Sequence, residues 1–309
     1  MALAVLCPGQ GAQHPAMLDL ALSHPAGRRA LDDGSAALGT DVREWLDADA
    51  MFANANAQPL ICLAQNAQWR ALRDDLPRPR ALAGYSVGEL SGYGVADAVD
   101  VATLAVLARQ RAMAMDAAAV ASPGGMIGIR GIPRRSLEAL CAEAGAHVAI
   151  ATTDDAFVVG ASEAGLAALA ARCERRGIET RSLHVGVAAH TPLLQAAVLP
   201  FKAALDASPL CDPAFPVVAG IDATTVMTRE RAIATLAPQI ARTIEWSQCL
   251  DALVERGCRV FLELGPGQAL SRMVRARYEE AEARAVDEFR SLAAVAAWVA
   301  RKLAQGAGP

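Results

Sequence analysis

The five residues from Gly84 to Gly88, which read Gly-Tyr-Ser-Val-Gly, constrain this chain more than any other feature. They stand between a short apolar run, Arg80 to Gly84, and a helical pattern that begins at Val87. A G-x-S-x-G turn between a strand and a helix exposes the serine, and the helix directs its first backbone N–H groups toward the same point. The sequence therefore predicts a nucleophile at Ser86 and an oxyanion donor at the N–H of Val87, with an ordinary strand-to-helix turn as the alternative.

The pattern around this turn is that of an α/β protein. The first strand is apolar without alternation, as in parallel sheets that are buried on both faces, and the last helix has one apolar face that predicts packing on the core. Asp100 is a suitable N-cap for the helix that follows it. The strands are expected at Ala2 to Cys7, Arg80 to Gly84, Phe215 to Ala219 and Arg259 to Leu264, and the helices at Gln58 to Arg73, Asp100 to Ala119 and Asp287 to Leu303.

The middle of the chain has a different texture, with short strands and helices in the order βαββαβ, which is the order of a ferredoxin-like unit. Because α/β patterning returns after it, we expect an insertion, residues 124–189, within a discontinuous large domain, residues 1–123 and 190–309. The large domain is expected to have a parallel sheet. The predicted elements of the insertion are Met126 to Arg130, Arg134 to Ala144, His147 to Thr152, Ala156 to Gly160, Glu163 to Arg176 and Ile178 to Val185.

Composition excludes several classes. The 309 residues suit about two domains. With 53% hydrophobic residues, 20% charged residues and a net charge of −4, neither a disordered chain nor a basic nucleic-acid binder is indicated. We find no apolar run of membrane-spanning length and no signal-peptide pattern, so we expect a cytoplasmic protein without a membrane partner.

Cysteine spacing argues against both disulfides and zinc. The chain has seven cysteines, an odd number, with no C-x-x-C pair and no histidine at ligand spacing. We expect most of them to be small core residues.

A serine needs a base within hydrogen-bond reach, and the five histidines are the first candidates. His190 is the best placed, because it lies where the insertion returns to the large domain and is followed by Pro192, which suits a helix start. His14, near the first glycine-rich loop, is the second candidate.

Two other features favour substrate contacts. The loop Pro8 to Gln13 follows the first strand, where ligands gather in doubly wound sheets, and it could supply an N–H to an oxyanion or be a plain turn. It is neither G-x-G-x-x-G nor a P-loop, so nucleotide binding is not supported. Arg109 and Arg111 interrupt an apolar helix, and one of them is a candidate for a ligand carboxylate, although a solvated helix face is the commoner explanation.

Five ordered motifs together resemble the malonyl-CoA:acyl-carrier-protein transacylase family. They are Gly9 to Gln13, Gly84 to Glu89, Arg111, Ala189 to Pro192 and Leu264 to Gln268, and they run over nearly the whole chain. The resemblance implies an α/β-hydrolase-like large domain with a ferredoxin-like insert. It also implies malonyl-CoA and an acyl carrier protein as partners, with no metal or redox cofactor.

The resemblance also implies a role for each matching residue. Ser86 would be the acylated nucleophile and His190 its base, oriented by the main-chain carbonyl of Gln239 rather than by a carboxylate. The N–H groups of Gln10 and Val87 would form the oxyanion hole. Arg111 would bind the malonyl carboxylate.

Two positions depart from the family pattern: Tyr85 stands where histidine usually precedes the serine, and Ala189 precedes His190. Either could alter acyl selection. The forms Gly-Tyr-Ser-Val-Gly-Glu-Leu and Ala-His-Thr-Pro-Leu-Leu look most like the epsilon subunit of malonate decarboxylase, whose carrier bears a phosphoribosyl-dephospho-CoA arm. A transacylase of fatty-acid synthesis is the alternative within the family.

Other classes stay open at this point. A serine esterase or thioesterase would use the same turn and an acid such as Asp154 or Asp155. A non-catalytic subunit that binds an acyl carrier would not need Ser86. Arginines that could meet CoA phosphates or an acidic carrier, or that are simply solvated, are Arg172, Arg175, Arg176, Arg181, Arg272, Arg275 and Arg277.

Overall fold

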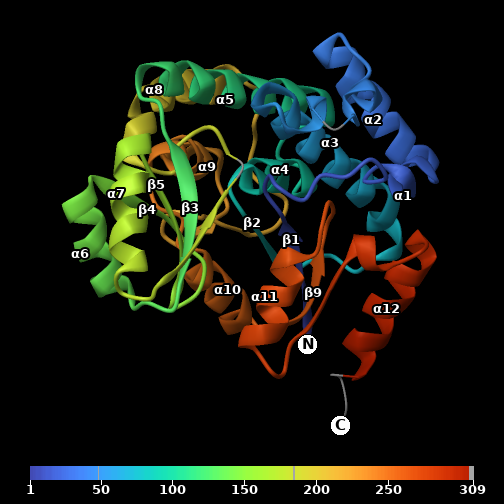
Figure 1. Cartoon of the computed structure of the whole chain (residues 1–309). Helices are drawn as coiled ribbons and strands as arrows, with labels where there is room; N and C mark the ends of the chain where they lie inside the picture. The colour runs from blue at the N-terminus through green and yellow to red at the C-terminus, as the bar shows by residue number, and fades with distance from the viewer. Residues whose placement is uncertain (48, 184, 306–309) are drawn as a thin grey trace.

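A six-stranded sheet forms the centre of the computed structural model, which describes residues 1–47, 49–183 and 185–305 (Figure 1). The strand order is β10-β9-β1-β2-β7-β8, and every neighbouring pair is parallel except β7 and β8. The mixed α/β class and the parallel sheet expected from the sequence are thus confirmed. The strands are β1 (Ala2–Cys7), β2 (Ala81–Gly84), β7 (Val217–Val218), β8 (Thr225–Val226), β9 (Cys258–Glu263) and β10 (Glu282–Ala285).

Helices cover this sheet and bury its apolar strands (Figure 1). α4 (Val87–Val95) packs on β1 and β2, and α3 (Asn54–Leu72) packs on α4 and on α5 (Val101–Ala121). The side chain of Asp100 accepts the N–H of Thr103, so the predicted N-cap of α5 is confirmed. The remaining helices of this part are α1 (Asp19–Leu22), α2 (Pro25–Leu38), α8 (Gln195–Ala207), α9 (Arg229–Leu236), α10 (Trp246–Glu255), α11 (Ala269–Arg277) and α12 (Leu292–Gln305).

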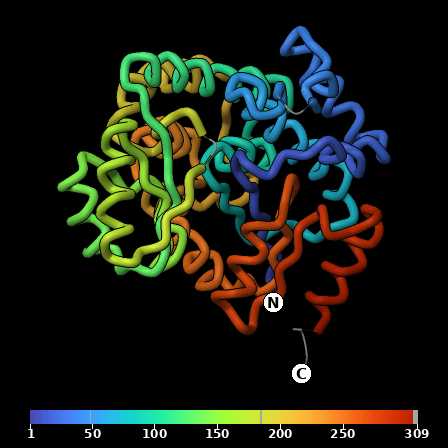
Figure 2. The backbone as a smooth tube through the Cα atoms, viewed as in Figure 1, coloured from blue at the N-terminus to red at the C-terminus, as the bar shows by residue number. Residues whose placement is uncertain are grey.

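A second sheet is built from the middle of the chain and lies beside the first (Figure 2). It has four antiparallel strands in the order β4-β5-β3-β6, with two helices between them, so the predicted βαββαβ order is observed. This part has a cluster of buried residues of its own, which lies between Ile127 and Cys173. The elements are β3 (Gly125–Arg130), α6 (Arg134–Ala144), β4 (Ala146–Ala151), β5 (Ala156–Ala161), α7 (Glu163–Glu174) and β6 (Glu179–Ser182).

The edge strand β4 joins the second sheet to a loop segment of the large part of the molecule, between η5 (Pro238–Ala241) and α10. Ile150 forms a parallel bridge with Ile244, with hydrogen bonds of 2.8 Å from the N–H of Ala151 to the carbonyl of Ile244 and 2.9 Å from the N–H of Ile244 to the carbonyl of Ala149. The hydroxyl of Thr243 adds a bond of 2.7 Å to the carbonyl of Val148. The chain segment that follows η5 is therefore attached to the second sheet.

Three expectations are corrected. The last helix begins at Leu292 rather than Asp287, because a 3-10 turn (Val286–Glu288) and the strand β10 precede it. β10 was missed because its sequence, Glu-Ala-Arg-Ala, has no apolar run and lies at a sheet edge. The predicted strand Ile178 to Val185 is confirmed only as Glu179–Ser182, and His184 within it lies outside the described residues.

Six of the seven cysteines are buried and only Cys211 is exposed, as expected for core residues. No helix within residues 1–47, 49–183 and 185–305 combines the length and apolar character that a membrane crossing requires.

Gly88 gives a test of how tightly the first turn of α4 packs. A Cβ at this position would lie 2.0 Å from the carbonyl oxygen of Cys7, a backbone atom that cannot move aside alone. Overpacking of this kind costs about 2 kcal/mol, so we expect Gly88→Ala to lower the free energy of unfolding by about that amount in chemical denaturation. Gly128→Ala is the control, because its Cβ would meet only the carbonyl of Arg181 at 3.8 Å. Equal stability of the two variants would contradict this packing.

Candidate active site

Ser86 lies at a strained turn between β2 and α4. Its φ of 58° and ψ of −120° are unfavourable for a residue with a side chain, and such strain is held in place only by tight surroundings. Glycine is required on both sides: a Cβ on Gly84 would lie 2.1 Å from the backbone N of Glu89, and one on Gly88 would meet β1. The strand-turn-helix setting predicted for G-x-S-x-G is confirmed.

His190 is brought to Ser86 from 104 positions later in the chain, and its Nε2 lies 2.8 Å from the Ser86 Oγ. Its Nδ1 lies 2.6 Å from the carbonyl oxygen of Gln239, which can only accept, so Nδ1 carries the proton and the Ser86 hydroxyl donates to Nε2. The backbone N–H of His190 donates to the carbonyl of Ile240 at 2.7 Å. The imidazole is thus oriented for taking a proton from the serine, without a carboxylate.

Burial determines the charge of this histidine. His190 is only 2% exposed, and loss of hydration, followed by the nearby positive charge of Arg111, lowers its pKa to about 3. A neutral imidazole can accept a proton, whereas an imidazolium cannot.

The loop after β1 lies directly against the serine turn. A Cβ on Gly9 would stand 2.8 Å from the carbonyl oxygen of Tyr85 and 3.5 Å from the Ser86 Cβ, so Gly9, which precedes Gln10, borders the turn. The side chain of Gln65 donates to the carbonyl of Pro8 at 2.7 Å and holds this loop. Val87 is the first residue of α4, where helix N–H groups have no partner within the helix.

His14, the second candidate for the base, does not contact Ser86. Its Nε2 lies 2.9 Å from Asp287 Oδ2, the same atom that accepts the N–H of Gly267 at 2.7 Å. His14 therefore connects the loop after β1 to the 3-10 turn after β10 and, through Asp287, to the loop after β9.

Arg111 is fully buried beside this site. Its Nη1 donates to Gln58 Oε1 at 2.7 Å and its Nη2 to Gln239 Oε1 at 3.0 Å, while its buried Nε has no hydrogen-bond partner among the described residues. Burial lowers its pKa to about 10, so the guanidinium remains charged near neutral pH. Arg109 points elsewhere and donates to the carbonyl of Leu38 at 2.9 Å.

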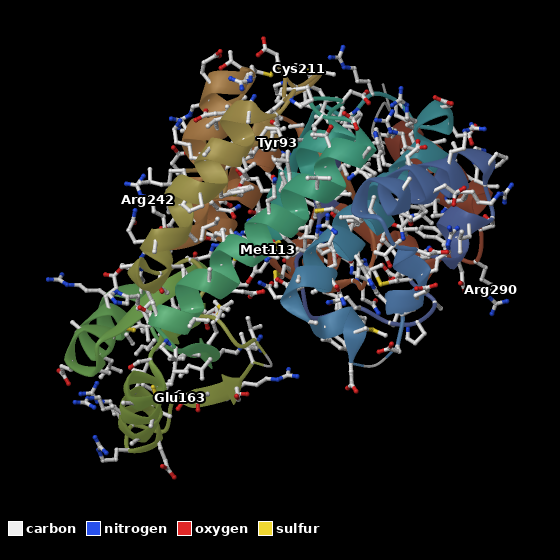
Figure 3. The ribbon with its side chains drawn as sticks, turned by 90° about the horizontal axis from the view of Figure 1, so that it is seen from above. Tyr93, Met113, Glu163, Cys211, Arg242 and Arg290 are labelled. Atoms are coloured by element: carbon white, nitrogen blue, oxygen red, sulfur yellow. The ribbon has the colours of Figure 1, made fainter. Side chains whose placement is uncertain are left out.

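Open space flanks the site on two sides. A pocket of 210 Å³ is lined by residues that include Gln10, Asn54, Asp116 and Val187. A wider cleft of 840 Å³ is lined by His190 together with residues of the second sheet's unit and the exposed Arg242, which Figure 3 shows at the edge of the molecule. No group of three or more His, Cys, Asp or Glu side chains within the described ranges is arranged to hold a metal ion.

Several residues discussed above lie away from Ser86. Asp154 is 82% exposed and pairs with Arg277 at 3.3 Å, so it does not contact His190. Arg275 and Arg277 have partners within the molecule, Glu288 and Asp251 respectively. Exposed Glu163, at the start of α7, lies in the second sheet's unit, as Figure 3 shows.

Tyr85 packs edge-on against Trp246, with ring centroids 5.3 Å apart. Burial raises the pKa of Tyr85 to about 12, so its hydroxyl stays neutral.

Two buried polar residues of the site, Gln58 and Glu89, were assigned no role from the sequence, although Glu89 ends the motif around Ser86. Burial raises the pKa of Glu89 to about 7, and its Oε2 accepts from the Gln239 Nε2 at 2.6 Å. Each is a polar residue in a largely buried helix, a signal that also drew attention to Arg111.

Known proteins share both sequence and fold with this chain. A family model described as the acyl transferase domain matches residues 5–299. The malonyl CoA-acyl carrier protein transacylase of Bacillus subtilis is 26% identical over 88% of this chain and 89% of its own length. The enzyme of that name from Escherichia coli K12 is 25% identical over 94% of this chain and 97% of its own.

Solved structures of related proteins have the same fold as this chain. A malonyl-CoA:acyl carrier protein transacylase from Xanthomonas oryzae superposes with a TM-score of 0.91 at 28% identity, covering 97% of this chain and 98% of its own. An acyl-carrier-protein S-malonyltransferase from Burkholderia pseudomallei gives 0.91 at 27% identity, covering 96% of this chain and all of its own. The chain therefore belongs to the acyl transferase domain family and is an acyltransferase.

Proposed function

We propose that this acyltransferase moves a malonyl group from malonyl-CoA to the thiol of an acyl carrier protein through a malonyl-serine intermediate. The observation that carries the proposal is the pairing of the Ser86 Oγ with His190 Nε2 at 2.8 Å beside the buried guanidinium of Arg111. The names of the sequence relatives and of the structures above support the same substrate and acceptor.

In the first half of the cycle His190 takes the hydroxyl proton as Ser86 attacks the thioester carbonyl. The N–H groups of Gln10 and Val87 stabilise the oxyanion, and the Gln239 carbonyl holds the imidazole. CoA leaves as the thiol with the proton returned by His190. The carrier thiol then gives its proton to His190, attacks the malonyl ester, and releases Ser86 as the free hydroxyl.

Arg111 is proposed as the group that selects malonyl. A guanidinium in a site that excludes water gains most from a ligand carboxylate, and an acetyl group leaves its charge without that partner. The Arg111 Nε has no hydrogen-bond partner among the described residues, so it could donate a hydrogen bond to such a carboxylate.

For the carrier we propose the malonate decarboxylase system, with this chain as its epsilon subunit, on the strength of the sequence around Ser86 and His190. The transacylase of fatty-acid synthesis is the second candidate, and the names of the relatives fit it equally well. Measured transfer rates decide between them: a carrier with a phosphoribosyl-dephospho-CoA arm should be the better acceptor, and a preference for a phosphopantetheine arm would favour fatty-acid synthesis.

We also propose that the molecule is divided into an α/β-hydrolase-like domain, residues 1–123 and 190–309, and a ferredoxin-like insert, residues 124–189. The separate buried cluster between Ile127 and Cys173 and the strand order of the second sheet support this division.

The acyl-enzyme is tested by mass spectrometry after mixing the protein with malonyl-CoA or acetyl-CoA. We expect a single malonyl group on the peptide that contains Ser86, little with acetyl-CoA, and none in Ser86→Ala, because only a serine oxygen can form the ester. Free malonate without an adduct would favour the hydrolase class. If neither an adduct nor free malonate is detected, the result would favour a binding subunit.

Removing the guanidinium should change acyl preference. We expect Arg111→Ala to lower the rate of malonyl transfer about a hundredfold, the effect of losing hydrogen bonds to a charged group, while acetyl and propionyl groups become relatively better substrates. Arg109→Ala is the matched control on the same helix, since its side chain contacts Leu38 instead. Unchanged preference in Arg111→Ala would remove this residue from the role.

The buried neutral state of His190 predicts a pH-dependent stability. Its pKa is about 3 in the folded protein against 6.5 for an ordinary histidine, so below pH 6.5 the unfolded chain binds a proton that the folded chain does not. When the pH is lowered from about 7.5 to about 5, we expect this residue to reduce the free energy of unfolding by about 2 kcal/mol. Chemical denaturation at both pH values, compared with His190→Gln, measures the difference. A difference that does not vary with pH would show that His190 titrates normally.

A further inference from the structure

The buried guanidinium of Arg111 is held by two neutral amides and by no carboxylate within the described part of the chain. The side-chain oxygens of Gln58 and Gln239 accept hydrogen bonds from its two terminal nitrogens, at 2.7 Å and 3.0 Å. Both glutamines are fully buried. A buried positive charge with only neutral partners is unusual, because burial of an ion is costly unless an opposite charge lies near.

On one side the amide of Gln239 is oriented by Glu89. The Gln239 Nε2 donates to Glu89 Oε2 at 2.6 Å and to the carbonyl of Ser86 at 3.1 Å, and Glu89 Oε2 is also held by the N–H of Gly220 at 2.9 Å. If this amide turned over, its oxygen would face the carboxylate and its NH₂ group would face the guanidinium. The second contact would bring two donors together. Glu89 Oε2 already accepts the N–H of Gly220, and a proton on Glu89 can sit on Oε1, which has no hydrogen-bond partner among the described residues. Oε2 therefore stays an acceptor and sets which end of Gln239 meets Arg111.

On the other side the amide of Gln58 is oriented through one more residue. The Gln58 Nε2 donates to Asn54 Oδ1 at 2.9 Å, and the Asn54 Nδ2 donates to Asp116 Oδ1 at 2.7 Å. Asp116 accepts only, so it sets the orientation of Asn54, and Asn54 sets that of Gln58. The guanidinium therefore lies between two carboxylates, each separated from it by one or two amides.

We propose that Glu89 and Asp116 are positioning residues for Arg111 and that they set its preference for acyl groups that carry a carboxylate. The inference rests on the proposed function and extends it to two residues whose side chains form no hydrogen bond with Ser86 or His190 within the described part of the chain. At this separation the carboxylates keep the guanidinium oriented without forming an ion pair that a substrate would have to break. The acyl carboxylate then becomes the first anion in direct contact with Arg111.

Asp116 offers the cleaner test, because it is partly exposed and lines the 210 Å³ pocket. In Asp116→Ala, Asn54 keeps only a 3.3 Å bond to the carbonyl of Ala112, so Asn54 and, through it, Gln58 are held less firmly beside the guanidinium. We expect the ratio of malonyl to acetyl acylation rates to fall about tenfold, as for the loss of an oriented hydrogen bond to a charged group. The exposed Gln110, next to Arg111 on α5, supplies the control Gln110→Ala, whose ratio should match the wild type.

Glu89→Leu tests the other side, because leucine offers no acceptor to the Gln239 Nε2. In Glu89→Gln, the matched control, the new amide oxygen can take the place of Oε2 and keep the bonds from Gln239 and from the N–H of Gly220. We expect the malonyl to acetyl ratio to fall in Glu89→Leu at least as far as in Asp116→Ala, and to stay near the wild type in Glu89→Gln. The acetyl rate should stay within about twofold of wild type, because His190 bonds to the main chain of Gln239 rather than to its side chain.

The two acyl groups are compared by time-resolved mass spectrometry of the Ser86 adduct, with circular dichroism to show that each variant is folded. A lower ratio in Asp116→Ala and in Glu89→Leu, with acetyl rates preserved, supports the inference. If the wild type is malonylated and both variants keep its ratio, or lose malonyl and acetyl rates equally, the inference is overturned and the proposed function stands. A change in one variant alone overturns the role of the other residue. If the wild type takes no malonyl group, the proposed function itself fails.

Discussion

Gln239 is the residue on which the arrangement of the site depends. Its main-chain carbonyl accepts from His190, its side-chain oxygen accepts from Arg111, and its amide nitrogen donates to Glu89 and to the carbonyl of Ser86. Each of these bonds is buried or partly buried, where a lost partner leaves an unsatisfied polar group and costs more than a surface bond. The orientation of the imidazole and that of the guanidinium are therefore linked through a single side chain and its backbone.

Much of the fold could be predicted because its determinants are local. β1 and β2 are apolar runs next to glycines or turns, and β9 has the apolar centre Val-Phe-Leu after a glycine. The G-x-S-x-G turn combines a strand, a strained residue and a helix start within a few positions. β8 and β10 were not predicted, because neither has a local signal. β8 is only two residues long, and β10 alternates charged residues with alanine, so neither shows the apolar pattern of a strand.

The site was predictable only in part. Arg109 and Arg111 carry the same signal in the sequence, and a spacing of two places them on nearly opposite sides of a helix, which is why only one of them reaches Gln239. Gln239 itself was named through resemblance. The amide contacts of Gln58 and Glu89 join residues that are 53 and 150 positions from their partners, and no local pattern specifies such pairs.

The attachment of β4 to the segment at Ile244 has a mechanical consequence. That segment follows directly on η5, which contains Gln239, and it is hydrogen-bonded to β4 through Ala149 and Ala151. A displacement of the small sheet would pull first on these bonds and then, a few residues away, on the carbonyl that orients the imidazole. The small sheet is thus a fixed support of the site, and a strain on the bonds at β4 would be transmitted to the position of His190.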